Sequence, residues 1–187
     1  MSRIFLGLAA LPLMGMAQTG AMVVNVGGSA ARSCYLSAEA RDASSAAIDE
    51  CDKAVQQGML DERNLVASHV NRGILYLVRN NYPSAEADFD RAMTLSPNQP
   101  EAWLNSGIAH LEQGRALSAA PRFEKALSLR TSKPAIAYYG LALAKEDRGD
   151  LRGAYADLKR AVELSPQWAL PAREMKRYRF ARKGGPD

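Results

Sequence analysis

The sequence has few of the residues that carry enzyme chemistry. Only two histidines and two cysteines occur among its 187 residues, and no cluster of them has the spacing of a zinc site. A glycine-rich phosphate loop is missing as well, since Gly27-Gly28 lacks the lysine and the helix that would complete one. No serine stands in a strand–turn–helix setting that would expose a nucleophile. We therefore expect no catalytic residue, no metal site, no cofactor and no enzymatic activity.

Aromatic residues are also scarce, and most of the chain carries no excess of charge of one sign. Aromatic residues make up 7% of the chain and hydrophobic residues 47%, a composition typical of an Ala/Leu-rich helical protein rather than a sandwich or barrel. The net charge of +4 arises in residues 173–187, which hold six basic and two acidic residues. The remaining chain is close to neutral, so the high pI does not indicate a nucleic-acid groove.

The chain has one long apolar run, and this run is too short to cross a membrane. It covers residues 4–16 and contains Pro12, whereas a membrane-spanning helix needs roughly 20 apolar residues. Arg3 precedes the run and the small-x-small sequence Gly15-Met16-Ala17 ends it. This pattern predicts an export signal over residues 1–17. The alternative is an uncleaved anchor on a membrane-attached assembly factor.

What the chain does contain is a ladder of small residues that occurs three times. Its members are spaced by 12 and then 7 residues, and a large apolar residue lies between the last two. The first two sets are 34 residues apart and the last two 35. Such a period predicts an all-α solenoid of stacked helical hairpins rather than a single-core enzyme domain. The sets are Gly73, Ala85, Phe89 and Ala92; Gly107, Ala119, Phe123 and Ala126; and Ala142, Ala154, Leu158 and Ala161.

The middle unit shows how each hairpin is expected to form. Trp103, Gly107 and Leu111 recur at four-residue steps, so they share one face of a first helix. Gly114 accepts the left-handed turn conformation that ends this helix. The small residue at Gly107 lets the second helix approach closely, and Phe123 is expected to fill the space between the two.

This pattern resembles the tetratricopeptide repeat family. Trp103–Gly107 and Ala119–Phe123–Ala126 carry the likeness, and Thr131 departs from it where a closing proline is usual. The resemblance implies a right-handed α-α superhelix that binds a peptide or partner protein on its concave face without covalent chemistry. The chain is also similar to small exported repeat proteins of Gram-negative bacteria, which implies a periplasmic location. The likeness covers residues 65–166, in units at about residues 66–99, 100–133 and 135–168, and Pro97 and Pro166 match the closing proline.

Further segments flank the three repeats. Residues 18–29 are expected to be extended or disordered, and residues 30–60 to form a degenerate hairpin. Cys34 and Cys51 fall on its two helices, about equally far from the turn. In an oxidising compartment such a pair usually closes, so a structural disulfide is predicted. A reactive pair, which would suit a thiol-dependent enzyme, and two free thiols are the alternatives. Residues 168–187 are expected to form a capping helix and a basic tail, with contact of the tail to anionic lipid as the alternative.

Partner binding is predicted on the concave side, which the first helices of the units line. Asn71 and Asn105 lie one period apart and can pair with the backbone of an extended peptide. Apolar neighbours would take the side chains of that peptide. The alternative is self-association or occlusion of this apolar face by residues 21–29. The predicted groove residues are Val70, Asn71, Ile74, Leu77, Leu104, Asn105, Ile108, Leu111, Tyr139, Leu143 and Glu146.

Overall fold

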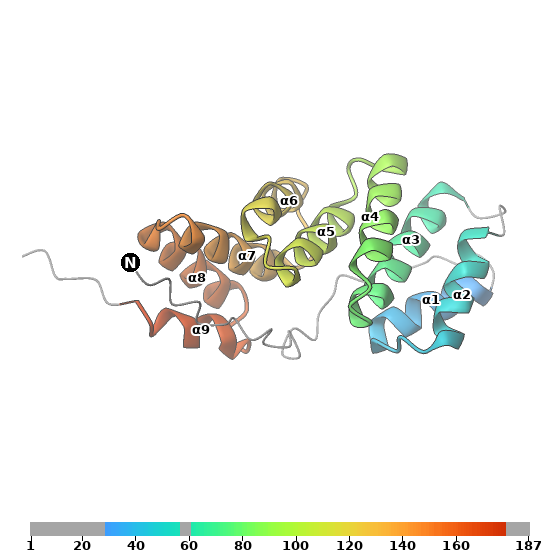
Figure 1. Ribbon diagram of the computed structural model, residues 1–187, viewed down its shortest axis with the longest axis horizontal. Coiled ribbons are helices and arrows are strands. Elements are labelled where there is room, and N and C mark those ends of the chain that lie inside the picture. Colours follow the sequence, from blue (N-terminus) through green and yellow to red (C-terminus); the bar gives the residue numbers. More distant parts are fainter. Residues whose placement is uncertain (1–28, 57–60, 179–187) are drawn as a thin grey trace, which may run out of the picture.

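A computed structural model describes residues 29–56 and 61–178. These residues form nine helices and no strand, as the repeat pattern predicts. Eight of the helices pair into four hairpins that follow one another along the long axis, and the ninth packs against the last hairpin (Figure 1). The helices are α1 Ser29–Ala40, α2 Ser45–Gln56, α3 Glu62–Val78, α4 Tyr82–Leu95, α5 Pro100–Glu112, α6 Ala116–Ser128, α7 Pro134–Asp147, α8 Leu151–Leu164 and α9 Ala169–Met175.

The hairpins stack in two layers that differ in how tightly their helices meet. The first helices, α1, α3, α5 and α7, pack directly on one another. The second helices pack on the first helices, and no comparable contact joins α2 to α4, α4 to α6 or α6 to α8 in the described chain. The first helices therefore form the inner layer of a curved solenoid, whose concave side they line.

Glycine residues allow the close approach of the two layers. A Cβ atom on Gly73 would lie 2.5 Å from the ring of Phe89, and one on Gly107 would lie 2.7 Å from the ring of Phe123. The opposite edge of the Phe123 ring would meet a Cβ on Gly140 at 2.1 Å. Phe123 therefore fills the space inside its own unit, as predicted, and also joins that unit to the next one.

The turns inside three successive hairpins share the same backbone conformation. Asn80, Gly114 and Gly149 have φ values of 56°, 70° and 79° and occupy the same position in successive units. Glycine adopts this left-handed conformation without steric cost, and asparagine tolerates it better than most residues. Asp150 then caps α8 by accepting a 2.9 Å hydrogen bond from the backbone N–H of Gly153.

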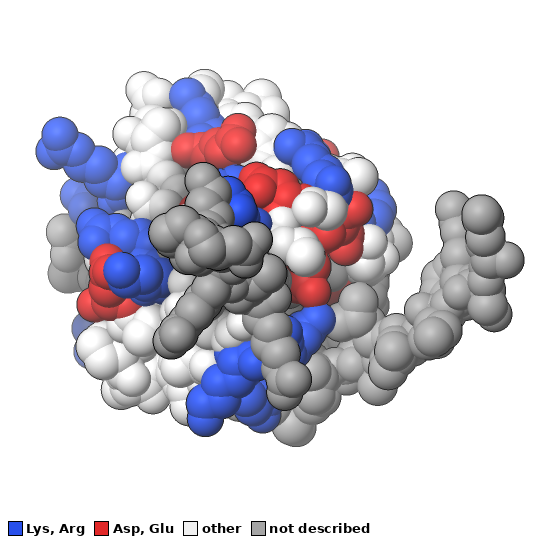
Figure 2. Space-filling view, turned by 90° about the vertical axis from the view of Figure 1, so that its left-hand side faces the viewer, with Lys and Arg blue, Asp and Glu red and all other residues white. Residues whose placement is uncertain are grey.

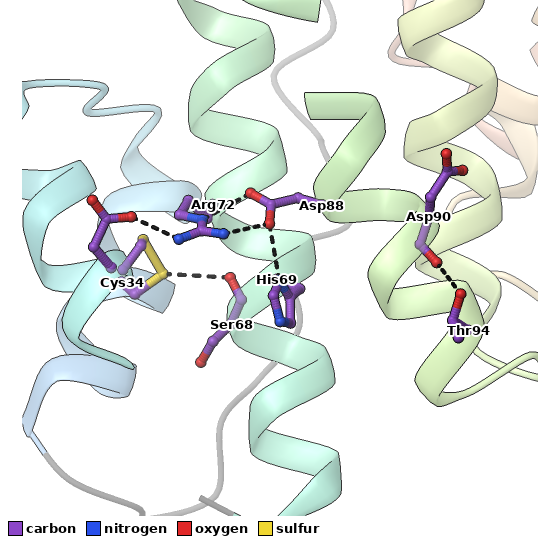
Figure 3. Close-up of polar contacts among 9 residues, drawn as sticks. Cys34, Ser68, His69, Arg72, Asp88, Asp90 and Thr94 are labelled. Atoms are coloured by element: carbon purple, nitrogen blue, oxygen red, sulfur yellow. Dashed lines mark hydrogen bonds and ion pairs between the residues drawn. A yellow bond between two sulfur atoms is a disulfide. The ribbon is translucent and has the colours of Figure 1, made fainter. Parts of the chain in front are cut away.

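A disulfide bond closes the first hairpin. Cys34 and Cys51 are joined at an S–S distance of 2.06 Å, with their Cα atoms 4.7 Å apart, and both are fully buried. The Cys34 sulfur also lies 3.8 Å from the carbonyl oxygen of Ser68 in α3 (Figure 3). The predicted pairing is therefore present, and it sits where the end hairpin meets the first full repeat.

The C-terminal end is covered by a shorter helix than the sequence predicts. α9 ends at Met175, and the chain then turns through residues 176–177. Arg177 and Tyr178 both bind Glu146 of α7, at 2.6 Å and 2.9 Å. These contacts hold the turn against α7. Trp168, just before α9, packs against Tyr139 in a tilted arrangement, with ring centroids 5.1 Å apart.

Several predicted segments lie outside the described residues. These are the export signal over residues 1–17, most of the segment at residues 18–29, and the basic tail after residue 178. Ser29, the last residue of that segment, already belongs to α1. Within the described ranges, no helix is both long enough and apolar enough to cross a membrane.

Candidate partner-binding surface on the inner helices

The predicted groove residues lie on the inner helices α3, α5 and α7. Two of them, Asn71 and Asn105, are asparagines at equivalent positions of successive units. Asn71 and Asn105 each stand two residues before the glycine that faces the outer layer. At about 100° per residue, each asparagine points roughly 160° away from α4 or α6. Their side chains are therefore directed away from the second helix of their own unit.

Most of these residues are buried, which the sequence does not predict. Burial is complete or nearly so in the middle of α3 and α5, whereas the residues near the ends of α5 and α7 remain partly exposed. A partner that approaches the concave side therefore meets the ends of these helices first. The buried residues are Val70, Asn71, Ile74, Leu77, Leu104, Asn105, Ile108 and Tyr139, and the partly exposed ones are Leu111, Leu143 and Glu146.

Asn105 has an unused acceptor in this buried setting. Its amide nitrogen donates to the carbonyl oxygen of Glu101 at 2.9 Å, one turn earlier in α5. Its Oδ1 atom accepts no hydrogen bond from the described part of the chain, although the side chain is 0% exposed. A buried acceptor without a donor costs about 1–3 kcal/mol. This position is therefore suited to a donor such as a backbone N–H group.

Glu112 is a carboxyl group held partly out of water on the same helix. Burial raises the pKa of Glu112 to about 7, against a smaller opposing effect of Arg41 at the end of α1. Within the described ranges, no cation lies at ion-pair distance from its carboxylate. A positively charged group beside Glu112 would stabilise the ionised form. The sequence alone does not indicate this raised pKa.

Glu146, predicted as part of the groove, already has hydrogen-bond partners among the last described residues. Its two oxygens accept from Arg177 and from the hydroxyl of Tyr178. Burial, followed by the bond to Glu146, raises the pKa of Tyr178 above its ordinary value. At this end of the molecule basic and acidic side chains lie next to each other (Figure 2). The neighbouring Asp147 is exposed, and its pKa is raised by partial burial and by Glu146.

A second buried carboxylate, Glu101, has a role that the sequence does not predict. Its oxygens accept from the Thr131 hydroxyl at 3.1 Å and from the backbone N–H of Ser132 at 2.8 Å. Thr131 stands where the repeat usually has its closing proline. The Glu101 contact therefore fixes the connection between α6 and α7 by hydrogen bonds instead. Because Glu101 is engaged in this way, it belongs to the packing between units rather than to the partner surface.

An ionic cluster joins the end hairpin to the first full repeat. Arg72 of α3 binds Asp52 of α2 at 2.7 Å and binds Asp88 of α4 through two nitrogens at 2.7 and 2.8 Å. His69, one turn before Arg72, lies 2.9 Å from the same Asp88 carboxylate (Figure 3). His110, the other histidine, is buried, and desolvation followed by Arg122 lowers its pKa. Both histidines therefore occupy packing positions.

Chemistry at a metal is not indicated by this arrangement. Among the described residues, no group of three or more His, Cys, Asp or Glu side chains could hold a metal ion. The inner surface instead offers apolar side chains, amide groups and the Glu112 carboxyl. Such groups suit non-covalent recognition of a polypeptide.

Comparison with known families agrees with the geometry. The family model for the tetratricopeptide repeat matches residues 70–134 and 109–167, which together span more than half of the chain. Comparison with curated proteins found no match. Tetratricopeptide repeats generally mediate protein–protein interaction. The alternating helices, the glycine–phenylalanine contacts and the matched residues agree, and the chain belongs to the tetratricopeptide repeat family.

Proposed function

We propose that the protein is a non-enzymatic scaffold that binds an extended peptide, or an extended segment of a partner protein, along its inner helices. The observation that carries this proposal is the buried Oδ1 acceptor of Asn105 among the apolar residues of the inner helix α5. An extended peptide supplies backbone N–H donors at regular intervals and can place apolar side chains between them. The site favours this ligand over a small polar molecule.

The ends of α5 and α7 are proposed as the accessible part of this site. Leu111 and Leu143 are half-buried there, and Glu112 lies next to Leu111. A basic residue on the partner would favour ionisation of Glu112 and lower its raised pKa. The partner class that fits is therefore an apolar extended segment with a basic residue near one end.

The proposed place of action is outside the cytoplasm, in the periplasm of a Gram-negative bacterium. Two features support this proposal: the export-signal pattern of residues 1–17 and the buried disulfide of the first hairpin. Intact-mass measurement of the exported protein tests the signal, since removal of residues 1–17 is expected. The disulfide gives little support to a thiol-dependent enzyme, because both sulfur atoms are shielded from solvent.

The binding proposal is tested by charged substitutions at partly exposed positions, which pack at the edge of the core. Ile74 and Ile108 are unsuitable because both are buried in the hydrophobic core. The test variant is Leu111→Glu with Leu143→Glu, at half-buried positions of the inner helices. The matched control is Leu117→Glu with Leu151→Glu, since both of these leucines are 48% exposed on the outer helices.

Each variant is cross-linked to its partners in the native envelope, captured and compared with wild type after circular dichroism shows that it is folded. The captured partner is identified, purified and titrated against all three proteins. We expect the inner variant to lose binding and the outer variant to retain it. Equal binding by both variants, or loss only in the outer one, would show that the inner helices are not the binding surface.

A further inference from the structure

The repeats carry opposite charge in their two halves. Residues 29–112, which include α1 to α5, contain seven basic and twelve acidic residues, a net charge of −5. Residues 113–178, which include α6 to α9, contain thirteen basic and seven acidic residues, a net charge of +6. The repeats are therefore nearly neutral as a whole, but their N-terminal half is acidic and their C-terminal half is basic.

The outer helices show this polarity in order along the chain. The net charge is −2 on α2 and on α4, and +1 on α6 and on α8. One repeat position shows the reversal directly. The residue after the large apolar residue of the ladder is Asp90 in α4, Glu124 in α6 and Lys159 in α8, and all three are exposed. The outer layer therefore changes from an acidic to a basic surface between α4 and α8.

Four exposed charges on the outer helices are available to a partner. Asp49 of α2 and Asp90 of α4 lie on the acidic side, and Arg152 and Lys159 of α8 lie on the basic side. None of these four side chains takes part in an ion pair with the described part of the chain. A partner of opposite charge would meet them without breaking a contact inside the fold.

Exposed apolar side chains accompany the basic charges. Leu117 of α6 and Leu151 and Leu164 of α8 are 38–48% exposed. On the acidic helices, the exposed residues one turn before the exposed aspartates are small, namely Ala46 in α2 and Ala87 in α4. Protruding leucines on one surface and small residues on the other, with opposite charges around them, match the apolar centre and polar rim of a protein interface.

We propose that two copies of the chain associate through their outer helices in antiparallel orientation, with α2 and α4 of each copy facing α8 and α6 of the other. Each of these pairings brings opposite net charges together, whereas a parallel arrangement would oppose like charges. A twofold axis closes the contact and limits it to a dimer. A uniformly anionic surface, such as a layer of lipid headgroups, attracts the basic half and repels the acidic half. The charge pattern therefore favours a second copy.

The antiparallel dimer leaves the inner helices of both copies facing away from the contact. One assembly then presents two inner surfaces on opposite sides, and a partner with two binding segments gains avidity from binding both. The dimer does not depend on the proposed function, because the outer helices form it and the inner helices are assigned to partner binding.

Charge reversal tests the proposal in the purified protein, with the oligomeric state measured by analytical ultracentrifugation. One variant reverses the acidic side, Asp49→Lys with Asp90→Lys. The other reverses the basic side, Arg152→Glu with Lys159→Glu. All four residues are exposed, so these substitutions should change stability little, and circular dichroism with urea unfolding checks that each variant is folded.

The matched control is Lys133→Glu with Lys176→Glu. It changes the net charge of the basic half by the same amount as the α8 variant, but both lysines lie outside the outer helices. A contact through α6 and α8 therefore predicts different results for the control and the α8 variant.

We expect wild type to dimerise at micromolar concentrations in about 0.05 M salt and to dissociate in about 0.5 M salt, because salt screens exposed charges. Each charge-reversed variant alone should have a dissociation constant about a hundredfold larger or more, since symmetry repeats each lost attraction at both ends of the dimer. An equimolar mixture of the two variants should form a heterodimer, because the reversed halves attract each other. The control should dimerise like wild type.

Several results would overturn the proposal. Wild type could be monomeric in low salt, the reversed variants could dimerise as tightly as wild type, or their mixture could fail to pair. Equal loss in the control would show that α6 and α8 do not form the contact. If monomeric wild type binds vesicles of phosphatidylglycerol and the Arg152→Glu, Lys159→Glu variant does not, the partner of the basic half is an anionic lipid surface. Partner capture by the Leu111→Glu, Leu143→Glu variant is a separate measurement, so failure of one proposal is distinguishable from failure of the other.

Discussion

Replacement of Arg72 by methionine should destabilise the fold more than the loss of an ordinary surface charge. Arg72 is the cation shared by Asp52 and Asp88, and its side chain is 17% exposed. The Asp88 side chain is 4% exposed, so removal of Arg72 leaves a buried carboxylate with only His69 beside it. The Arg72→Met variant keeps most of the side-chain volume, and the charge is the main quantity that changes.

The size of the effect follows from the burial of each partner. Removing one member of a buried ion pair typically costs about 3–5 kcal/mol. Asp52 is 36% exposed, so its part of the interaction is screened by water and contributes about 0.5 kcal/mol. We expect Arg72→Met to lower the free energy of unfolding by about 3 kcal/mol, at the lower end of the range because His69 still contacts Asp88.

A double-mutant cycle, measured by urea unfolding, separates the Arg72–Asp88 interaction from other effects of the substitution on α3. The Arg72→Met, Asp88→Asn variant has neither charge, so we expect it to be less destabilised than Arg72→Met alone, by about 2 kcal/mol. Hydrogen bonds and charges of Asp88 and Asp52 raise the pKa of Arg72 above its ordinary value in spite of burial. Arg72 thus stays charged throughout the accessible pH range. The reasoning is refuted if the single variant loses less than about 1 kcal/mol, or if the two substitutions are simply additive.

Three further predictions concern a carboxyl group, a covalent bond and two glycines. Burial raises the pKa of Glu112 to about 7, so the folded protein is favoured at low pH and loses stability as the pH rises from the unfolded pKa near 4.5 through 7. Glu112→Gln should therefore raise the free energy of unfolding by about 1 kcal/mol at pH 8 and change it little at pH 4. A pH-independent difference between the variant and wild type in urea unfolding would contradict this. Cys51→Ser should cost about 3 kcal/mol, and an unchanged melting temperature without reductant would show that the disulfide adds no stability. Gly140→Ala should cost about 1–3 kcal/mol because its Cβ would meet the Phe123 ring, whereas Gly114→Ala has free space at a φ of 70° and should cost about 1 kcal/mol. Denaturation of the two glycine variants compares these costs, and a smaller cost for Gly140→Ala than for Gly114→Ala would argue against the predicted clash with Phe123.

The hairpins could be predicted because their determinants are local and recur. Gly107 and Phe123 are 16 residues apart in one unit, and their contact depends only on a helix, a turn and a second helix. The same spacing places Gly73 against Phe89. The turn glycines are likewise recognisable because the conformation they adopt is rare for other residues. Each of these features is read within a single period of the sequence.

The contacts between units could not be predicted in the same way. Arg72 meets Asp52 and Asp88 only after three helices have taken their positions, and nothing in the local sequence distinguishes these residues from solvated charges. Thr131 appears in the sequence as a missing proline, and its bond to Glu101 spans 30 residues. The burial of the predicted groove residues depends on the elements packed around α3 and α5. Helical phase reports only which side of one helix a residue occupies, so it suggests an open groove.

The position of these unpredicted contacts follows from the physics of a solenoid. An inner unit is held by a neighbour on each side, whereas an end unit has one neighbour and exposes an apolar face. The N-terminal hairpin compensates with the disulfide and with the Arg72 cluster that joins α2 to α3 and α4. The C-terminal hairpin compensates with α9, whose following residues bind Glu146. Because both ends of the described solenoid are closed by contacts within the chain, the inner helices α3, α5 and α7 are the surface on which the proposed partner would bind.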